Sequence, residues 1–326
     1  MEPKAAINRT FIDIHPCYEF DKTTYVFTSN PSISCVLLYI FLGLFSVVTI
    51  CGNLLVIISV IYFKQLHMPT NYLILSLAMT DLLVGVLVCP FSMAFTVTSC
   101  RFQPVLFCKV RGSIDVTLST ASIMNLCFIS IDRYYAVCQP LTYRIKINDR
   151  VTGIMILVTW GVAALIGIGI MIASFNRQQC GQSCLVDAVI STILACVFSF
   201  YMPVIIMLSI YLKIFLVAQS QANSIQSTKS GATVSKMERK ATKTLAIVMG
   251  VFLLCWSPFF FCLTFLSFSN AKVSLPVFET LNWLSLTNSM LNPFIYAFFY
   301  SWFRSAFKMI IYGKIFQGDF TNSKLH

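Results

Sequence analysis

Charged residues are scarce in this chain of 326 residues. Aspartate and glutamate together number 12 and lysine and arginine 23, so charged residues make up only 11% of the total, against 57% hydrophobic residues. A typical soluble domain is about one quarter charged. This balance excludes an ordinary soluble protein and indicates a chain that is integral to a membrane.

Histidine is also rare. The three histidines, His15, His67 and His326, are scattered over the two ends and one loop, so they form no cluster with metal-ligand spacing. We also find no Ser/His/Asp set and no phosphate-binding loop. These absences argue against an enzyme.

Cysteine is present at 13 positions that fall into two groups. One group lies inside apolar runs or at their ends, where small apolar filler is the ordinary role: Cys51, Cys89, Cys127, Cys138, Cys196, Cys255 and Cys262. The other group lies outside those runs, with Cys35 at a boundary, in a compartment that permits disulfides: Cys17, Cys100, Cys108, Cys180 and Cys184. No second Cys or His pair accompanies Cys180 and Cys184, so two disulfides are favoured there over a metal site.

Seven apolar runs are long enough to cross a bilayer, which takes roughly 20 residues. They cover residues 35–63, 71–97, 112–137, 151–173, 188–212, 244–268 and 277–300. Because the connecting loops are short, we predict one all-α bundle of seven transmembrane helices. Aromatic and basic residues then alternate at helical spacing over 302–312, which is typical of a short amphipathic helix on the inner leaflet. The predicted parts are an N-terminus (1–33), the bundle (34–300), and the amphipathic helix with a short tail (301–326).

The distribution of positive charge predicts the orientation of the bundle. Of the 23 lysines and arginines, 15 fall on the side opposite the N-terminus, and the richer side faces the cytoplasm. We therefore expect a multi-pass plasma-membrane protein with its N-terminus outside, where Asn8 begins a glycosylation acceptor. No cleavable signal peptide is visible, so the first span would act as its own insertion signal. The net charge of +11 is explained by this topology and by anionic lipid, without nucleic acid.

The third run carries charge at both ends of one helical face. Asp115 and Arg133 are about five turns apart, roughly 27 Å at ~1.5 Å per residue, and Ser119 shares the face with Asp115. An ionisable residue inside a membrane is read as functional. Our hypothesis is that a cation binds at Asp115 and that Arg133 reports it on the opposite side.

Other polar residues lie deeper in the runs. Asp81 has no lysine or arginine at its depth, so it needs water, a hydroxyl, an amide or a small cation, and Ser122, Asn288 and Asn292 are candidates. A purely structural polar cluster remains the alternative. In the sixth run, Phe252, Trp256, Phe259 and Leu263 form a stripe around Pro258, and such a stripe is more often core than a cofactor site.

Several motifs resemble those of the rhodopsin-like G-protein-coupled receptors over essentially the whole chain. They are Gly52-Asn53, Leu77-Ala-Met-Thr-Asp81, Asp132-Arg133-Tyr134, Trp160, Pro203, Phe252-Leu-Leu-Cys-Trp256-Ser-Pro258 and Asn292-Pro293-Phe-Ile-Tyr296. The stretch 288–303, with Cys17 and the Cys180/Cys184 pair, is similar to the trace amine-associated receptors.

This resemblance implies a receptor whose Asp115 pairs with a ligand ammonium. The residues expected to contact ligand are Asp115, Val116, Ser119, Cys196, Ser199, Trp256, Phe259, Phe260, Glu279, Asn282 and Leu286. Those expected to switch the receptor are Asp132, Arg133, Tyr134, Glu238, Ile123, Pro203, Phe252, Tyr211, Asn292, Pro293 and Tyr296. It also implies disulfides Cys108–Cys184 and Cys17–Cys180, and a sodium pocket formed by Asp81, Ser122, Asn288 and Asn292. No other cofactor is expected.

The partners implied are a small amine and a heterotrimeric G protein of the stimulatory class, with an arrestin and a receptor kinase as further partners. Most members of that family detect amines in olfaction. A peptide or lipid receptor of the same fold is the alternative. A light sensor would need a lysine in the seventh run, which has none, and a transporter would need a chain of buried acids.

Two departures from related receptors bear on which amine binds. Leu286 stands where many amine receptors place a tyrosine, and Ser199 is the one hydroxyl on the upper fifth run, which disfavours a catechol. Glu279 would lie ~10 Å above Asp115, two helical turns away. Two acids at that separation predict a diamine or polyamine such as cadaverine, putrescine or spermine. Aromatic monoamines are the runner-up, and Glu279 as a solvated acid at the helix end is equally open.

Overall fold

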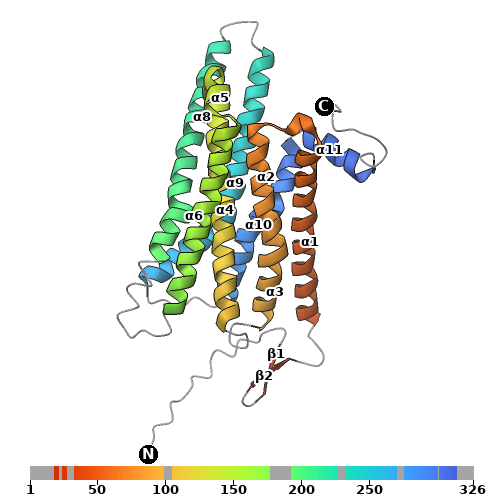
Figure 1. The fold of residues 1–326 in the computed structure, drawn as a ribbon, viewed down its shortest axis with the longest axis vertical. Helices are drawn as coiled ribbons and strands as arrows, with labels where there is room; N and C mark the ends of the chain where they lie inside the picture. Colours follow the sequence, from red (N-terminus) through yellow and green to blue (C-terminus); the bar gives the residue numbers. More distant parts are fainter. Residues whose placement is uncertain are drawn as a thin grey trace, which may run out of the picture.

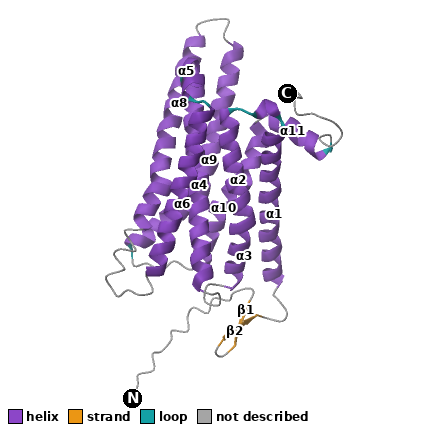
Figure 2. Cartoon of the chain, in the orientation of Figure 1, coloured by secondary structure: helices purple, strands orange, loops and turns teal. Residues whose placement is uncertain are grey.

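The computed structural model describes residues 18–21, 24–27, 33–98, 105–176, 192–226, 232–269, 275–299 and 301–313. The long helices of the described residues form seven rods, and these rods run side by side in one bundle (Figure 1, Figure 2). They are α1 (Ile33–Tyr62), α2 with α3 (Pro69–Leu83 and Cys89–Thr98), α4 (Val105–Cys138), α6 (Asp149–Asn176), α8 (Met202–Gln226), α9 (Ala232–Phe268) and α10 (Leu275–Phe299). The prediction of a seven-helix bundle is therefore confirmed.

Shorter elements lie at the two ends of the bundle. Strands β1 (Tyr18–Asp21) and β2 (Thr24–Phe27) pair as an antiparallel hairpin that the sequence patterning did not predict. The hairpin lies at one end, and α11 (Ser301–Ile311) lies at the other (Figure 1). The linkers include the 3₁₀ turn η1 (Lys64–Leu66) and α5 (Pro140–Lys146). An odd number of crossings places the hairpin and α11 on opposite faces of a membrane.

Six described helices are long and apolar enough to cross a bilayer, counting α2 and α3 as one. The seventh rod, α10, has 25 residues but falls below that hydropathy, because asparagines and serines interrupt its apolar residues. Several helices also run past the predicted spans. For example, α9 begins at Ala232 rather than at 244, because hydropathy detects only the part of a helix that lies in lipid.

Two wide helical turns precede two prolines. The π-turn η2 (Val84–Val88) ends two residues before Pro90, and the π-turn η4 (Val197–Tyr201) ends two residues before Pro203. Proline lacks a backbone N–H and its ring clashes with the preceding turn, so a wider turn lets each helix continue. Each π-turn shifts the register of the side chains above it.

Close contacts hold α10 against α1. A Cβ atom on Gly52 would lie 2.9 Å from Cγ of Pro293, so only glycine fits there without a shift. Beside it, Nδ2 of Asn53 donates a hydrogen bond of 3.1 Å to the carbonyl oxygen of Ser289. Asn53 therefore bonds to a neighbouring helix, as polar side chains in membrane-spanning helices commonly do.

The amphipathic helix α11 docks by one face. Ala306 is buried with Phe63 and Leu66, which follow the end of α1, and Phe303 is buried in a cluster with Val56 and Tyr296, while Ile311 is exposed. Arg304 closes the end of α10 by donating hydrogen bonds to the carbonyl oxygens of residues 297 and 298.

Candidate functional site

A cavity of about 310 Å³ opens between α4, α9, α10 and the helical residues 192–196 that lead into η4. It lies toward the end of the bundle that carries the β1–β2 hairpin, and we call it the outer cavity. Nine of the eleven residues predicted to contact ligand line it: Asp115, Val116, Ser119, Cys196, Ser199, Trp256, Phe259, Phe260 and Asn282.

Asp115 provides a carboxylate of the outer cavity. Oγ of Ser119, one turn along α4, donates a hydrogen bond of 3.3 Å to Oδ1 of Asp115. An ionised carboxylate can accept up to about four hydrogen bonds. Asp115 therefore retains capacity for a charged donor that enters the cavity.

Aromatic rings form the wall opposite Asp115. Phe260 stacks on Phe200 with centroids 4.3 Å apart, and Trp256 and Phe259 pack against Phe260 at 6.0 and 5.7 Å. Phe259 in turn contacts Phe278 of α10, at 5.5 Å. Ring faces attract cations and bury apolar groups, so this wall suits a ligand with a charged end and an apolar body.

The hydroxyl of Ser199 is already engaged, since it donates a 2.6 Å hydrogen bond to the carbonyl oxygen of Ala195. Its oxygen can still accept a hydrogen bond, but its proton is already donated to the backbone of the same helix. Cys196 on the same side of the cavity is buried, and Thr192, four residues before Cys196, also lines this side.

Leu286 and Glu279 are not among the described residues that line the outer cavity. Leu286, at 1% exposure, packs with Phe45, Val88 and Leu118 in an apolar cluster. Burying the apolar side chain of Leu286 among other apolar side chains is favourable, which explains why it packs there.

Glu279 is not a solvated acid at the helix end. It is 5% exposed, and its Oε2 lies 3.8 Å from Nη2 of Arg111 on α4. The same Nη2 donates a hydrogen bond of 3.2 Å to Oγ of Ser92 on α3. Arg111 also lines the outer cavity, a role that the sequence patterning missed because Arg111 stands just before the apolar run.

Phe278 is a second lining residue that was not predicted. It precedes Asn282 by four residues, so the two share one face of α10. That spacing was a signal that could have found it.

Asp81 lies at the centre of a buried polar cluster. Its carboxylate accepts hydrogen bonds from Ser289 and Asn292 on α10, both 2.7 Å, and from Ser122 on α4 at 3.3 Å. Asn288, predicted to join this cluster, is buried, but its Nδ2 has no hydrogen-bond partner among the described residues. Ser289 takes its place, since neighbouring residues on a helix point about 100° apart.

A second polar cluster joins α2, α4 and α5 near the other end of the bundle. Nη2 and Nε of Arg133 lie 2.6 and 2.9 Å from Oδ2 of Asp132, and Nη2 also donates to Thr70. The hydroxyl of Tyr143 donates a 2.8 Å bond to Oδ1 of Asp132. Arg133 is therefore held along its own helix and against α2. Tyr134 follows, with its ring edge-on to Tyr135.

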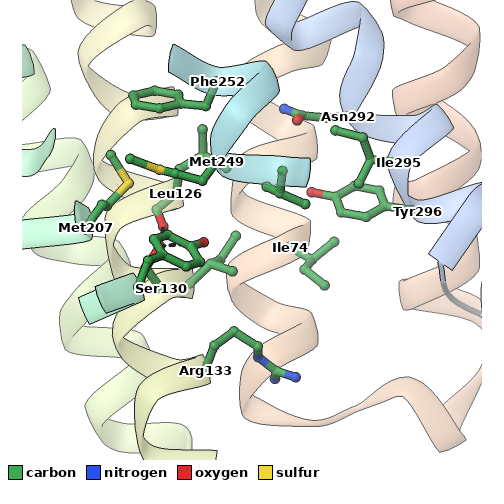
Figure 3. Close-up of a pocket in the computed structure, with 13 residues that line it drawn as sticks. Ile74, Leu126, Ser130, Arg133, Met207, Met249, Phe252, Asn292, Ile295 and Tyr296 are labelled. Carbon is green, nitrogen blue, oxygen red and sulfur yellow. Dashed lines mark hydrogen bonds between the residues drawn. The ribbon is translucent and has the colours of Figure 1, made fainter. Parts of the chain in front are cut away.

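A small cavity of about 40 Å³ lies just above Arg133. Figure 3 shows Tyr296 and Asn292 entering it from α10, Met249 and Phe252 from α9, and Arg133 at its lower end. Tyr211 also lines it and accepts a 3.1 Å hydrogen bond from Oγ of Ser130. The predicted switch residues Arg133, Tyr211 and Tyr296 thus border one space.

A continuous apolar cluster connects the two cavities. It contains Ile123, Phe252 and Trp256, all at most 2% exposed. The cluster also includes Val204, the neighbour of the buried Pro203. A displacement of Trp256 in the outer cavity would therefore be transmitted by contact toward Arg133.

Some predicted positions lie outside the described residues or side chains. They are the disulfide partners Cys17, Cys108, Cys180 and Cys184, the unassigned Cys35 and Cys100, the glycosylation acceptor Asn8, and the side chain of Glu238. Among the described residues, no group of three or more His, Cys, Asp or Glu side chains lies together.

Known proteins resemble this chain along most of its length. The family described as "7 transmembrane receptor (rhodopsin family)" matches residues 52–296. Trace amine-associated receptor 1 of Macaca mulatta is 46% identical over 88% of this chain and 91% of the relative, and that of Homo sapiens is 44% identical over the same shares. Trace amine-associated receptor 4 of Mus musculus is 42% identical over 90% of both chains. The chain is therefore a multi-pass membrane receptor, not an enzyme, and it belongs to the trace amine-associated receptors of the rhodopsin family.

Proposed function

We propose that the chain is a plasma-membrane receptor that binds a protonated amine in the outer cavity and activates a heterotrimeric G protein. The observation that carries this proposal is Asp115, a carboxylate with spare hydrogen-bonding capacity facing a wall of aromatic rings. A ligand ammonium would donate to Asp115, and charge-assisted bonds of this kind are about twice as strong as neutral ones.

The ligand that fits best carries one ammonium group and an apolar or aromatic body. Asp115 takes the charge, and the rings of Trp256, Phe259 and Phe260 take the body. A diamine or polyamine bridging Asp115 and Glu279 is the second candidate, supported by the burial of Glu279. The pairing of Glu279 with Arg111 weighs against it, because a second ammonium would compete with a cation already in place.

The effect of ligand binding would be transmitted to the cytoplasmic face through the apolar cluster. An amine body against Trp256 would shift the packing of Phe252 and Ile123. Arg133 would then leave Asp132 and Thr70 and turn toward Tyr211 and Tyr296 across the small cavity. This rearrangement would admit a G protein of the stimulatory class, followed by a receptor kinase and an arrestin. Family membership suggests that the receptor detects amines in olfaction.

The orientation follows from charge. The cytoplasmic side holds the larger share of lysine and arginine, so the N-terminus and the outer cavity face outside. Asp81, Ser122 and Ser289 offer oxygen ligands and one charge, which fits a sodium ion, while Asn292 donates its amide N–H to Asp81.

Asp115→Asn tests the amine proposal. The expected result is a loss of amine potency of about 30-fold or more, because removing one partner of a buried charge pair costs roughly 2–5 kcal/mol. Potency is measured as second-messenger output over a panel of amines at matched surface expression. Asp149→Asn changes an exposed acid at the start of α6 and should keep potency unchanged. A wild-type receptor that reaches the surface but answers no amine would instead support a peptide or lipid ligand.

A further inference from the structure

Arg111 places a positive charge inside a cavity proposed to bind cations. It lines the outer cavity one helical turn from Asp115, on the same face of α4. Its side chain is 12% exposed, so this guanidinium is not simply solvated.

Contacts from two other helices fix its position. Glu279 of α10 lies 3.8 Å from Nη2, and Ser92 of α3 accepts a 3.2 Å hydrogen bond from the same atom. A planar guanidinium held from two sides loses little further freedom. Arg111 therefore forms a fixed part of the cavity rim.

We infer that Arg111 makes this receptor selective for ligands with a single ammonium group, by occupying Glu279 and the space where a second ammonium would sit. The inference rests on the proposed function, in which Asp115 takes the first ammonium. Of the two acids, only Asp115 then remains for the ligand, since Arg111 neutralises Glu279.

The cost to a diamine is electrostatic. Its second ammonium must either displace Arg111 from Glu279, which leaves a buried guanidinium without its acid, or lie against Arg111 with like charge. Both outcomes disfavour binding. A ligand of equal length with a neutral second end meets neither penalty.

The first experiment uses the wild-type receptor and three ligands built on the same five-carbon chain: n-pentylamine, cadaverine and N-acetylcadaverine. Affinity is measured by the ligand-induced rise in unfolding temperature of the purified receptor, beside the second-messenger response. We expect cadaverine to bind at least about tenfold more weakly than n-pentylamine, and acetylation of one end to restore most of the loss. Equal or tighter binding of cadaverine would overturn the inference and leave the amine proposal intact.

The second experiment removes the cation. Arg111→Gln should raise the affinity for cadaverine, relative to that for n-pentylamine, by about tenfold or more. One charge-assisted contact corresponds to at least that factor. Adding Glu279→Gln should remove the gain, and Arg111→Lys should keep the wild-type preference. An unchanged ligand ratio in a well-expressed Arg111→Gln receptor would refute the role of Arg111. The wild-type ligand series decides the question if a variant does not fold. No binding of these three amines or of any amine in the panel would reject the proposed function itself.

Discussion

At the residue scale, Asp132 holds the guanidinium of Arg133 by hydrogen bonds. It is fully buried, and it receives bonds from Arg133, Thr70 and Tyr143. Burial raises the pKa of Tyr143 above its ordinary value, the largest effect on that group, so its hydroxyl stays a donor. Arg133 borders the same cavity as Tyr211 and Tyr296, but these contacts direct its guanidinium toward Asp132 and Thr70.

Asp132→Asn should raise signalling in the absence of ligand. It removes the charge that holds Arg133, and hydrogen bonds to charged groups contribute about 1.5–3 kcal/mol, so the ratio of active to inactive receptor rises roughly 10- to 100-fold. Basal second messenger at matched surface expression measures the effect. Tyr143→Phe removes one bond but leaves the charge, so its increase should be smaller. Basal output equal to wild type in both variants would contradict this role.

Single side chains were predictable where helical spacing decides the neighbour. Ser119 follows Asp115 by four residues, and the two are hydrogen-bonded. Partners across helices were harder to predict. Ser289 rather than Asn288 reaches Asp81, because helix rotation and not sequence selects between adjacent residues. Arg111 escaped notice since nothing in its own helix indicates that Glu279 and Ser92 lie opposite.

At the element scale, α1 and α10 touch so closely that a methyl group matters. A Cβ at Gly52 would approach Pro293 to 2.9 Å, whereas one at Gly43, on the same helix, would meet nothing within 4 Å. Since Pro293 is a ring in a helix, it cannot turn aside as a flexible side chain can.

Gly52→Ala should therefore lower the thermal stability of the purified receptor, whereas Gly43→Ala should keep or raise it. Overpacking costs typically 1–3 kcal/mol, while Gly→Ala in a helix otherwise gains up to about 1 kcal/mol. Unfolding temperatures of the two variants in the same detergent supply the comparison. If the Gly52→Ala receptor is as stable as the Gly43→Ala receptor, then Pro293 can move aside to accommodate the added methyl group.

Helix number was predictable from apolar length, but side-chain register was not. The π-turns η2 and η4 each rotate the residues beyond them, and no hydropathy pattern reveals an extra residue in a turn. Helix ends beyond the bilayer were missed for a related reason, because only burial in lipid demands an apolar sequence.

At the scale of the whole molecule, Asp81 ties three rods together midway between the outer cavity and Arg133. Its partners come from α4 and α10, while it stands on α2. A sodium ion at this carboxylate would favour the arrangement described here, in which Arg133 is held by Asp132. An amine that favours another arrangement would then weaken sodium binding, and sodium would weaken amine binding by the same factor.

Replacing sodium chloride by N-methylglucamine chloride at constant ionic strength should raise amine affinity roughly fivefold or more, within the usual range of coupling between sites. Asp81→Asn should abolish this dependence, because the ion loses its one charged ligand. Competition binding on membranes in the two salts provides the measurement. If Asp81→Asn keeps the full sodium effect, the ion binds elsewhere.

Because α9 is long, a small rotation of this helix near the outer cavity would displace its far end by a large distance. Pro258 lies near Trp256, yet the helix continues to Ala232 and, with α8, projects past the neighbouring rods (Figure 1). From Pro258 to that tip is about 39 Å at ~1.5 Å per residue. Swinging this arm by a mere ten degrees would sweep its far end through about 7 Å, enough to open a docking cleft for a protein.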